Sequence, residues 1–150
     1  MYEEMALQLE SLMDGVPWWI TNLSNAAALI YESLDEINWA GFYWMRNGAL
    51  ELGPFQGKVA CTRIEIGRGV CGTAVQEDQV QRVEDVHQFP GHIACDGASN
   101  SEIVIPMHYN GRLVAVLDID SPLLNRFTLE DQEGLERCAA VLEQACDWII

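Results

Sequence analysis

Apolar and polar residues alternate along the chain with two different periods. Over residues 2–13 and 18–34, apolar residues recur three or four positions apart, which is typical of amphipathic helices. A third helical pattern follows Thr128-Leu-Glu-Asp131, a segment that resembles a capping box with Asp in place of the usual Glu or Gln. The pattern therefore predicts two helices before the middle of the chain and one after it.

Short runs of aliphatic and aromatic residues fill the middle of the chain. Asn47-Gly48 and Asn110-Gly111 each separate two such runs, and Asn-Gly between apolar runs is a strong signal for a β-hairpin. The second hairpin is so continuously apolar that both of its strands should be central in a sheet. The four expected strands are residues 37–46, 49–52, 103–107 and 113–119.

Weaker patterns lie between the two hairpins. Residues 59–66 and 80–84 are expected to form a half-exposed strand and a short strand, with a glycine-rich turn and a short helix ending near Glu77-Asp78 between them. This order predicts an α+β fold with a central antiparallel sheet of about six strands. The N- and C-terminal helices should cover one face of the sheet, and a loop-covered pocket beneath residues 53–62 and 85–102 should occupy the other.

Length and composition limit the classes of protein that the chain can belong to. It has 150 residues, of which 49% are hydrophobic, and this amount of apolar side chain suits a single domain spanning residues 1–150. No apolar run reaches the roughly 18 residues that a membrane span requires, and the N-terminus lacks the basic start of a signal peptide. We therefore expect a soluble cytoplasmic protein.

The charge balance is strongly acidic. Asp and Glu number 23 against 8 Lys and Arg, which gives a formal net charge of −15. A field of this sign repels phosphate backbones and anionic lipid surfaces. We expect neither nucleic acid nor a membrane as a partner.

Five cysteines are distributed over two kinds of environment. Cys138 and Cys146 lie on or beside the apolar stripe of the last helix, where a cysteine is usually a small buried hydrophobic residue. The other three lie at strand ends or glycine-rich turns next to polar residues, and they are Cys61, Cys71 and Cys95. In a reducing compartment, a disulfide among them would be catalytic or regulatory rather than structural.

Residues 85–102 concentrate reactive side chains ahead of the second hairpin. Cys95 is the best candidate for a reactive thiol, because a thiolate needs partial exposure and hydrogen-bonding groups of the kind that His87 and His92 supply. The same three residues with a second thiol could bind zinc. Their spacing matches no familiar zinc pattern and the chain has no Cys-x2-Cys pair, so no metal site is predicted.

Three carboxylates are expected near the second hairpin. Asp118 and Asp120 alternate at the end of a strand that should be central, so both face the same side and need a cationic partner or a shared proton. A strict two-residue turn at Asn110-Gly111 would direct Glu102 to the opposite face. If the three acids share a pocket, a bulge or a longer turn must lie between them, for example near Pro106.

Trp39 belongs to the first strand of the first hairpin. Core packing is the simplest explanation for an indole in a strand otherwise filled by aliphatic and aromatic residues. Its neighbours Asn38 and Gly41 nevertheless leave room for the ring to wall a pocket.

Several segments match a known family when they are taken together. They are Asn38-Trp-Ala-Gly-Phe-Tyr, Gly-Val-Cys71-Gly, Asp85-Val-His, Phe89-Pro-Gly-His-Ile-Ala-Cys95-Asp, Ser99-Asn-Ser-Glu102-Ile-Val-Ile-Pro and Val116-Leu-Asp118-Ile-Asp120-Ser-Pro. In these segments the chain resembles the free methionine-(R)-sulfoxide reductases, enzymes built on the GAF domain. The resemblance extends over nearly the whole chain, from the N-terminal helices to the last one.

The resemblance implies a role for each of the three candidate thiols. Cys95 would attack the sulfoxide sulfur and become a sulfenic acid, and Cys61 would resolve it by forming a disulfide. Cys71 would be an alternative or auxiliary thiol. Spacing alone leaves open whether Cys61 or Cys71 reaches Cys95.

The resemblance also implies roles for the pocket residues. Glu102, Asp118 and Asp120 would hold the substrate ammonium group and the sulfoxide oxygen, and Trp39 would cover the methyl group. A carboxyl that like-charged neighbours keep neutral is suited to protonate or hydrogen-bond a sulfoxide oxygen.

The partners expected from the resemblance are free methionine sulfoxide, a thioredoxin-like dithiol reductant and a second copy of the chain, with no bound cofactor. The alternative from a different class is a non-catalytic GAF module that binds a small ligand or senses redox state. In that case the cysteines would be structural or redox-sensing.

Overall fold

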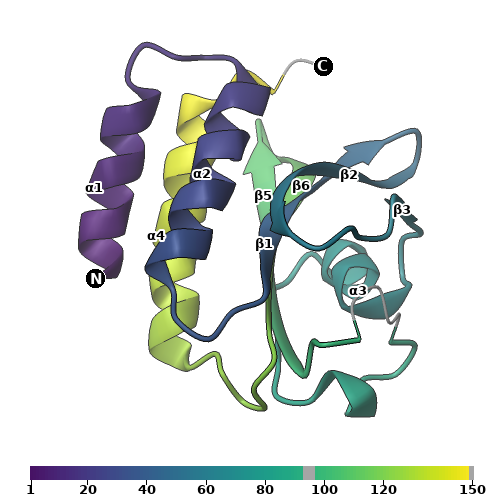
Figure 1. Ribbon diagram of the computed structural model, residues 1–150. Helices are drawn as coiled ribbons and strands as arrows, with labels where there is room; N and C mark the ends of the chain where they lie inside the picture. Colours follow the sequence, from purple (N-terminus) through teal and green to yellow (C-terminus); the bar gives the residue numbers. More distant parts are fainter. Residues whose placement is uncertain (93–96, 149–150) are drawn as a thin grey trace.

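A six-stranded antiparallel sheet forms the centre of the computed structural model, which describes residues 1–92 and 97–148 (Figure 1). The strands lie in the order β3-β2-β1-β6-β5-β4, and every neighbouring pair is antiparallel. Their bounds are β1 (Trp39–Arg46), β2 (Ala49–Gly57), β3 (Arg63–Ile64), β4 (Gln81–Val83), β5 (Ser101–Tyr109) and β6 (Arg112–Ser121). The predicted α+β fold with about six strands is confirmed.

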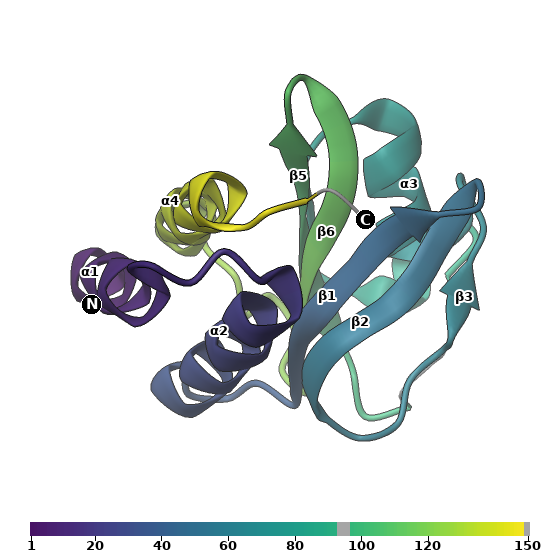
Figure 2. The same cartoon turned by 90° about the horizontal axis from the view of Figure 1, so that it is seen from above.

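The helices divide between the two faces of the sheet, as Figure 2 shows. Helices α1 (Tyr2–Met13), α2 (Trp19–Ser33) and α4 (Leu129–Ala145) lie on one side, and α3 (Gly69–Glu77) lies on the other. A single turn of 3₁₀ helix, η1 (Val86–Gln88), precedes the loop that leads to β5. The predicted placement of the terminal helices is therefore confirmed. No helix among the described residues is long and apolar enough to cross a membrane.

The helical face of the sheet holds the larger apolar core. The helical side chains of this core include the fully buried Leu9, Leu23 and Leu135, from α1, α2 and α4. Trp19 stacks on Trp44 of β1 with ring centroids 4.0 Å apart. This core accounts for the helical periodicity of the sequence, because the buried positions recur every three or four residues.

Two strands differ from the expectation. Strand β2 continues to Gly57 instead of ending before Gly53-Pro54, because a β-bulge opposite Phe42 accommodates these two residues and the pairing resumes at Phe55. The half-exposed strand expected over 59–66 is reduced to the two residues of β3, which pair with β2.

Both hairpin turns have the backbone that Asn-Gly pairs favour. The φ angles are 53° and 79° at Asn47 and Gly48, and 52° and 77° at Asn110 and Gly111. Positive φ at both central residues matches the right-handed twist of the strands, and glycine adopts it without steric cost. The two predicted two-residue turns are confirmed.

The register of the second hairpin places the acids. Next to the turn, His108 pairs with Leu113, whereas Met107 pairs with Ala115, so Val114 is an extra residue on β6. Beyond this bulge Glu102 pairs with Asp120. The predicted break in the hairpin register is therefore confirmed, and it lies at Val114 of β6.

Helix α1 packs on α4 at a glycine. A Cβ atom added at Gly134 would lie 2.1 Å from Cγ of Tyr2, much closer than any van der Waals contact. The Tyr2 hydroxyl donates a 2.6 Å hydrogen bond to Asp131, which also completes the capping box with Thr128. The N-terminal helix is thus attached to the first turn of the last one.

We expect Gly134→Ala to lower the free energy of unfolding by about 1–3 kcal/mol, because the methyl group must displace Tyr2. At an open helical position the same change would stabilise the protein by up to about 1 kcal/mol, so the sign of the effect reports on this contact. Urea denaturation measures it. Ser11→Ala, at an exposed site of α1, is the control and should change stability by less than about 0.5 kcal/mol. A Gly134→Ala protein at least as stable as the parent would contradict the packing.

Candidate active site

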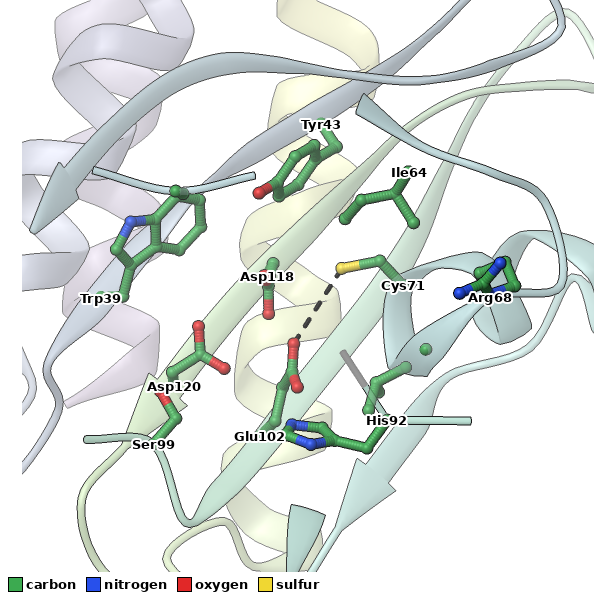
Figure 3. Close-up of a pocket in the computed structure, with 13 residues that line it drawn as sticks. Trp39, Tyr43, Ile64, Arg68, Cys71, His92, Ser99, Glu102, Asp118 and Asp120 are labelled. Carbon is green, nitrogen blue, oxygen red and sulfur yellow. Dashed lines mark hydrogen bonds between the residues drawn. The ribbon is translucent and has the colours of Figure 1, made fainter. Parts of the chain in front are cut away.

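A pocket opens on the face of the sheet opposite the terminal helices (Figure 3). Its walls come from β1, α3, β5, β6 and the loops beside them. Six of the residues singled out from the sequence line it, namely Trp39, Cys71, His92, Glu102, Asp118 and Asp120. Cys61 follows the lining residue Ala60 and packs against the apolar cluster that includes Trp39 and Cys71, and Cys95 lies outside the described residues.

The three acids come together because of strand alternation and the bulge. Asp118 and Asp120 are two residues apart on β6, so their side chains point to the same face. Glu102 is directly opposite Asp120 on β5 and therefore shares that face. On the other side of β6, Gly41 is opposite Asp118 and Trp39 is opposite Asp120. Gly41 leaves space there, since a Cβ atom on it would lie 2.8 Å from the Trp39 ring.

The three acids of the pocket are almost completely buried. Glu102, Asp118 and Asp120 are 8%, 5% and 9% exposed. Burial, and then the charges of Asp118 and Asp120, raise the pKa of Glu102 well above its ordinary value. Burial also raises the pKa of Asp118, although hydrogen bonds with Glu102 and Cys71 oppose that shift. The raised pKa favours the neutral form of Glu102, which carries a proton.

Cys71 is a neutral thiol of the pocket wall. It lies in the first turn of α3, is buried, and its Sγ is 4.0 Å from Oε2 of Glu102. Burial is the largest cause that raises the pKa of this thiol, followed by the charges of Asp118 and Glu102. Cys71 therefore belongs both to the core and to the pocket, and the nearby acids suppress its thiolate form.

Two aromatic side chains of β1 hold the segment that carries Cys61. The Trp39 indole donates a 3.0 Å hydrogen bond to the carbonyl of Lys58, and the Tyr43 hydroxyl donates one of 3.0 Å to the carbonyl of Cys61. The Trp39 ring also stacks with the rings of Tyr43 and Phe55, with centroid distances of 5.9 and 5.2 Å. Cys61 is disulfide-bonded, whereas Cys71, Cys138 and Cys146 carry free thiols.

Sequence reasoning did not single out Tyr43. The signal was present, because Trp39, Gly41 and Tyr43 alternate along one strand and therefore share the pocket face. Burial, and then the charge of Asp118, raise the pKa of the Tyr43 phenol, so it stays a hydrogen-bond donor. Arg68 was also missed, and it contributes a cationic side chain to the pocket lining.

The two histidines of the loop have different surroundings. His87 contacts Asn100 through Nε2, at 3.1 Å from the amide oxygen, and its backbone N–H donates to Asp85. His92 lines the pocket with its ring centroid 5.8 Å from that of His87. Burial, and then the neighbouring His87, lower the pKa of His92. His87 therefore connects η1 to the segment that leads into β5.

The predicted buried cysteines of the last helix are found where expected. Cys138 and Cys146 lie in the core on the helical face of the sheet. Burial raises the pKa of each thiol to about 11. Neither belongs to the pocket, which supports leaving them out of the chemistry.

Comparison with known proteins assigns the class. Residues 19–146 match the family model of the GAF domain, so the chain is a GAF-domain protein. It is similar to the free methionine-R-sulfoxide reductase of Escherichia coli (strain K12), with 54% identity over 95% of this chain and 87% of that protein. The solved structure of fRMsr of Staphylococcus aureus in its reduced form superposes with a TM-score of 0.94 at 49% identity, covering 96% of this chain and 94% of that one.

A further solved structure holds a substrate. Free methionine-R-sulfoxide reductase from Neisseria meningitidis in complex with its substrate superposes with a TM-score of 0.93 at 42% identity, covering 97% of this chain and 87% of that one. With identities of this size over nearly complete chains, the protein belongs to the family of free methionine-R-sulfoxide reductases, which are oxidoreductases. The family resemblance of the sequence segments is thereby confirmed.

Proposed function

We propose that the protein reduces free L-methionine-(R)-S-oxide to L-methionine. The observation that carries the proposal is the buried cluster of Glu102, Asp118 and Asp120 facing Trp39, on a chain of this family. In the described part of the chain, neither Glu102 nor Asp118 forms a salt bridge, and buried acids of this kind favour a ligand with a cationic group and a basic oxygen. Free methionine sulfoxide has both, in its ammonium group and its sulfoxide.

The first chemical step uses a neutral acid and a thiol. Glu102, whose pKa is raised by burial, donates a proton to the sulfoxide oxygen while the sulfur of Cys95 attacks the sulfoxide sulfur. The sulfur–oxygen bond of the substrate breaks, the oxygen ends on Cys95 as a sulfenic acid, and methionine leaves as the thioether. Cys95 is thereby oxidised by two electrons and the substrate is reduced by two.

The second step resolves the sulfenic acid. The Cys61 thiol attacks the sulfur of Cys95, a disulfide forms, and water leaves. The disulfide bonding of Cys61 and the hydrogen bond from Tyr43 to its backbone carbonyl support this thiol over Cys71, which is buried and neutral. Cys71 remains an auxiliary thiol in this scheme. An external dithiol then returns both cysteines to thiols by exchange.

Different residues of the pocket bind the ammonium group and the methyl group of the substrate. The carboxylates of Asp118 and Asp120 hold the ammonium group, and the indole of Trp39 covers the methyl group on sulfur. A peptide-bound residue has a neutral amide nitrogen in place of the ammonium group, so binding it would leave buried acids without their partner. The site should therefore select the free amino acid.

The partners in the reaction follow from this chemistry. We propose that thioredoxin is the dithiol, that no bound cofactor or metal takes part, and that the reaction takes place in the cytoplasm. We also propose a homodimer, supported by the exposed side chains of Leu7, Leu12 and Trp18 on and beside the terminal helices.

Turnover of matched substrates tests the proposed function. Free methionine-(R)-sulfoxide with thioredoxin should be reduced, and the N-acetylated amide of the same epimer should have a kcat/KM at least about a hundredfold lower, because its nitrogen is uncharged. The free S epimer should also be a poor substrate, since it exchanges the positions of the oxygen and the methyl group. Binding of the R epimer without turnover would instead support a GAF sensor module, and equal turnover of the N-acetylated amide would contradict the recognition of the ammonium group.

A further inference from the structure

We propose that the pocket also binds a divalent cation of borderline softness, such as Zn²⁺, through Cys71, Glu102 and Asp118, and that the cation excludes the amino-acid substrate. Cation binding is independent of the proposed reductase function. The exclusion of substrate rests on that function, because it assumes that methionine sulfoxide occupies the same acids.

The three ligand atoms are close enough to share one ion. The sulfur of Cys71, one oxygen of Glu102 and one oxygen of Asp118 all lie within 4.8 Å of one another. The sulfur and Oε2 of Glu102 are 4.0 Å apart. With Zn–S of about 2.3 Å and Zn–O of about 2.1 Å, a sulfur and an oxygen bound to tetrahedral zinc lie about 3.6 Å apart. A small rotation of either side chain closes the difference.

An unsatisfied oxygen points to a missing ligand in this cluster. No described residue forms a hydrogen bond with the buried Oδ1 of Asp118, and Asp118 is 5% exposed. Buried polar atoms without partners are rare in folded proteins and often mark an ion or a water molecule. Within residues 1–92 and 97–148, neither Asp118 nor Glu102 forms a salt bridge. A cation would supply the partner that this oxygen lacks.

The charges of the three side chains suit a dication. Two carboxylates and one thiolate would carry three negative charges in a buried site, and a divalent ion would offset two of these charges. Cys71 lies in the first turn of the nine-residue helix α3, whose N-terminal dipole favours the thiolate. Sulfur with two oxygens and an open fourth position is a donor set that zinc accepts.

The position of the ion explains why it would exclude substrate. Figure 3 shows the side chains of Cys71, Glu102 and Asp118 pointing toward one another in the middle of the pocket, with Trp39 and His92 at its sides. An ion there uses the same carboxyl oxygens that the proposed substrate needs. The pocket can hold one or the other.

Cobalt(II) is the probe for cation binding, because a thiolate bound to it produces a charge-transfer absorption band. We expect this band, at one ion per chain, when Co²⁺ is added to the full-length protein without a reductant, so that Cys61 stays in its disulfide. Zn²⁺ should displace Co²⁺ and remove the band. Cys71→Ser should remove the band, and Cys138→Ser, which changes a buried thiol on the other face of the sheet, should keep it.

A second variant guards against a folding defect in Cys71→Ser. Asp118→Asn keeps the shape and the thiol but loses a charged ligand, so it should weaken Co²⁺ binding at least about tenfold. An absent band in the parent protein, or a band that persists in a folded Cys71→Ser variant, would overturn the site.

Displacement by substrate separates the two proposals. Free methionine-(R)-sulfoxide should remove the cobalt band in proportion to its binding, and coexistence of the band with saturating sulfoxide would refute exclusion. If the reduced protein does not turn over the sulfoxide at all, the proposed function fails while the cobalt result stands. If it turns over normally and no cobalt band forms, only the cation site fails.

Discussion

Replacing Cys95 with serine is expected to lower turnover of free methionine-(R)-sulfoxide by at least about a thousandfold. A serine hydroxyl stays protonated at neutral pH and is a far weaker nucleophile toward sulfur than a thiolate, so the proposed first step has no replacement nucleophile. Cys71 cannot substitute for it, because burial and the nearby acids raise the pKa of that thiol. Thioredoxin-coupled consumption of the R epimer measures the effect.

The matched control for Cys95→Ser is Cys146→Ser. Cys146 is buried near the end of α4 in the core on the helical face, so its loss should leave kcat/KM within about threefold of the parent value. Binding of the R epimer to Cys95→Ser should persist, since the acids and Trp39 are intact. Turnover by this variant at a rate close to that of the parent would rule out Cys95 as the nucleophile.

Glu102→Gln is the second change with a large expected effect. The amide can donate a hydrogen bond but cannot deliver a proton, so kcat/KM should fall by about 10²–10⁴-fold. The pH dependence should change as well. The pKa of Glu102 is raised, the acid must be protonated to act, and the parent rate should therefore decline as pH rises through that pKa. Glu102→Gln should lose this decline.

The dependence of kcat/KM on pH, measured for the parent protein and for Glu102→Gln, tests whether Glu102 is the proton donor. Glu136→Gln, at an exposed position of α4, is the control and should reproduce the parent profile. Because Glu102 and Asp118 interact, the decline reports the pair, and only its loss in Glu102→Gln assigns it. A Glu102→Gln profile with an unchanged high-pH decline would transfer the role of proton donor to another group.

Local signals predicted most of the fold. The three long helices follow from apolar spacing, and the capping box at Thr128 marks the start of α4. Both hairpins follow from Asn-Gly pairs, because few other sequences adopt positive φ at two successive positions. These features depend on residues that are close together in the chain, which is why a pattern reveals them.

Two features of the sheet that the sequence did not predict, the end of β2 and the position of the bulge in the second hairpin, have a common physical cause. The strand expected over residues 49–52 continues past Leu52, because β1 pairs with β2 on both sides of a bulge that accommodates Gly53 and Pro54. A pocket shared by the three acids requires a bulge in the second hairpin, but the sequence did not show where this bulge lies. It lies at Val114, where α4 also contributes, since Glu143 accepts a hydrogen bond from the backbone of His108. Interactions between distant segments decided both positions.

In the candidate site, too, some features follow from the local sequence and others depend on contacts between distant segments. The sequence by itself determined which residue types were available: three thiols among polar residues, two aspartates on one strand and a third acid on its partner. Only the tertiary structure decided that Glu102 faces Asp118 and Asp120, that Cys71 is a neutral buried thiol, and that Tyr43 holds the Cys61 segment. Register, burial and hydrogen bonds across the sheet arise from contacts between residues far apart in the chain, and these contacts exist only after folding.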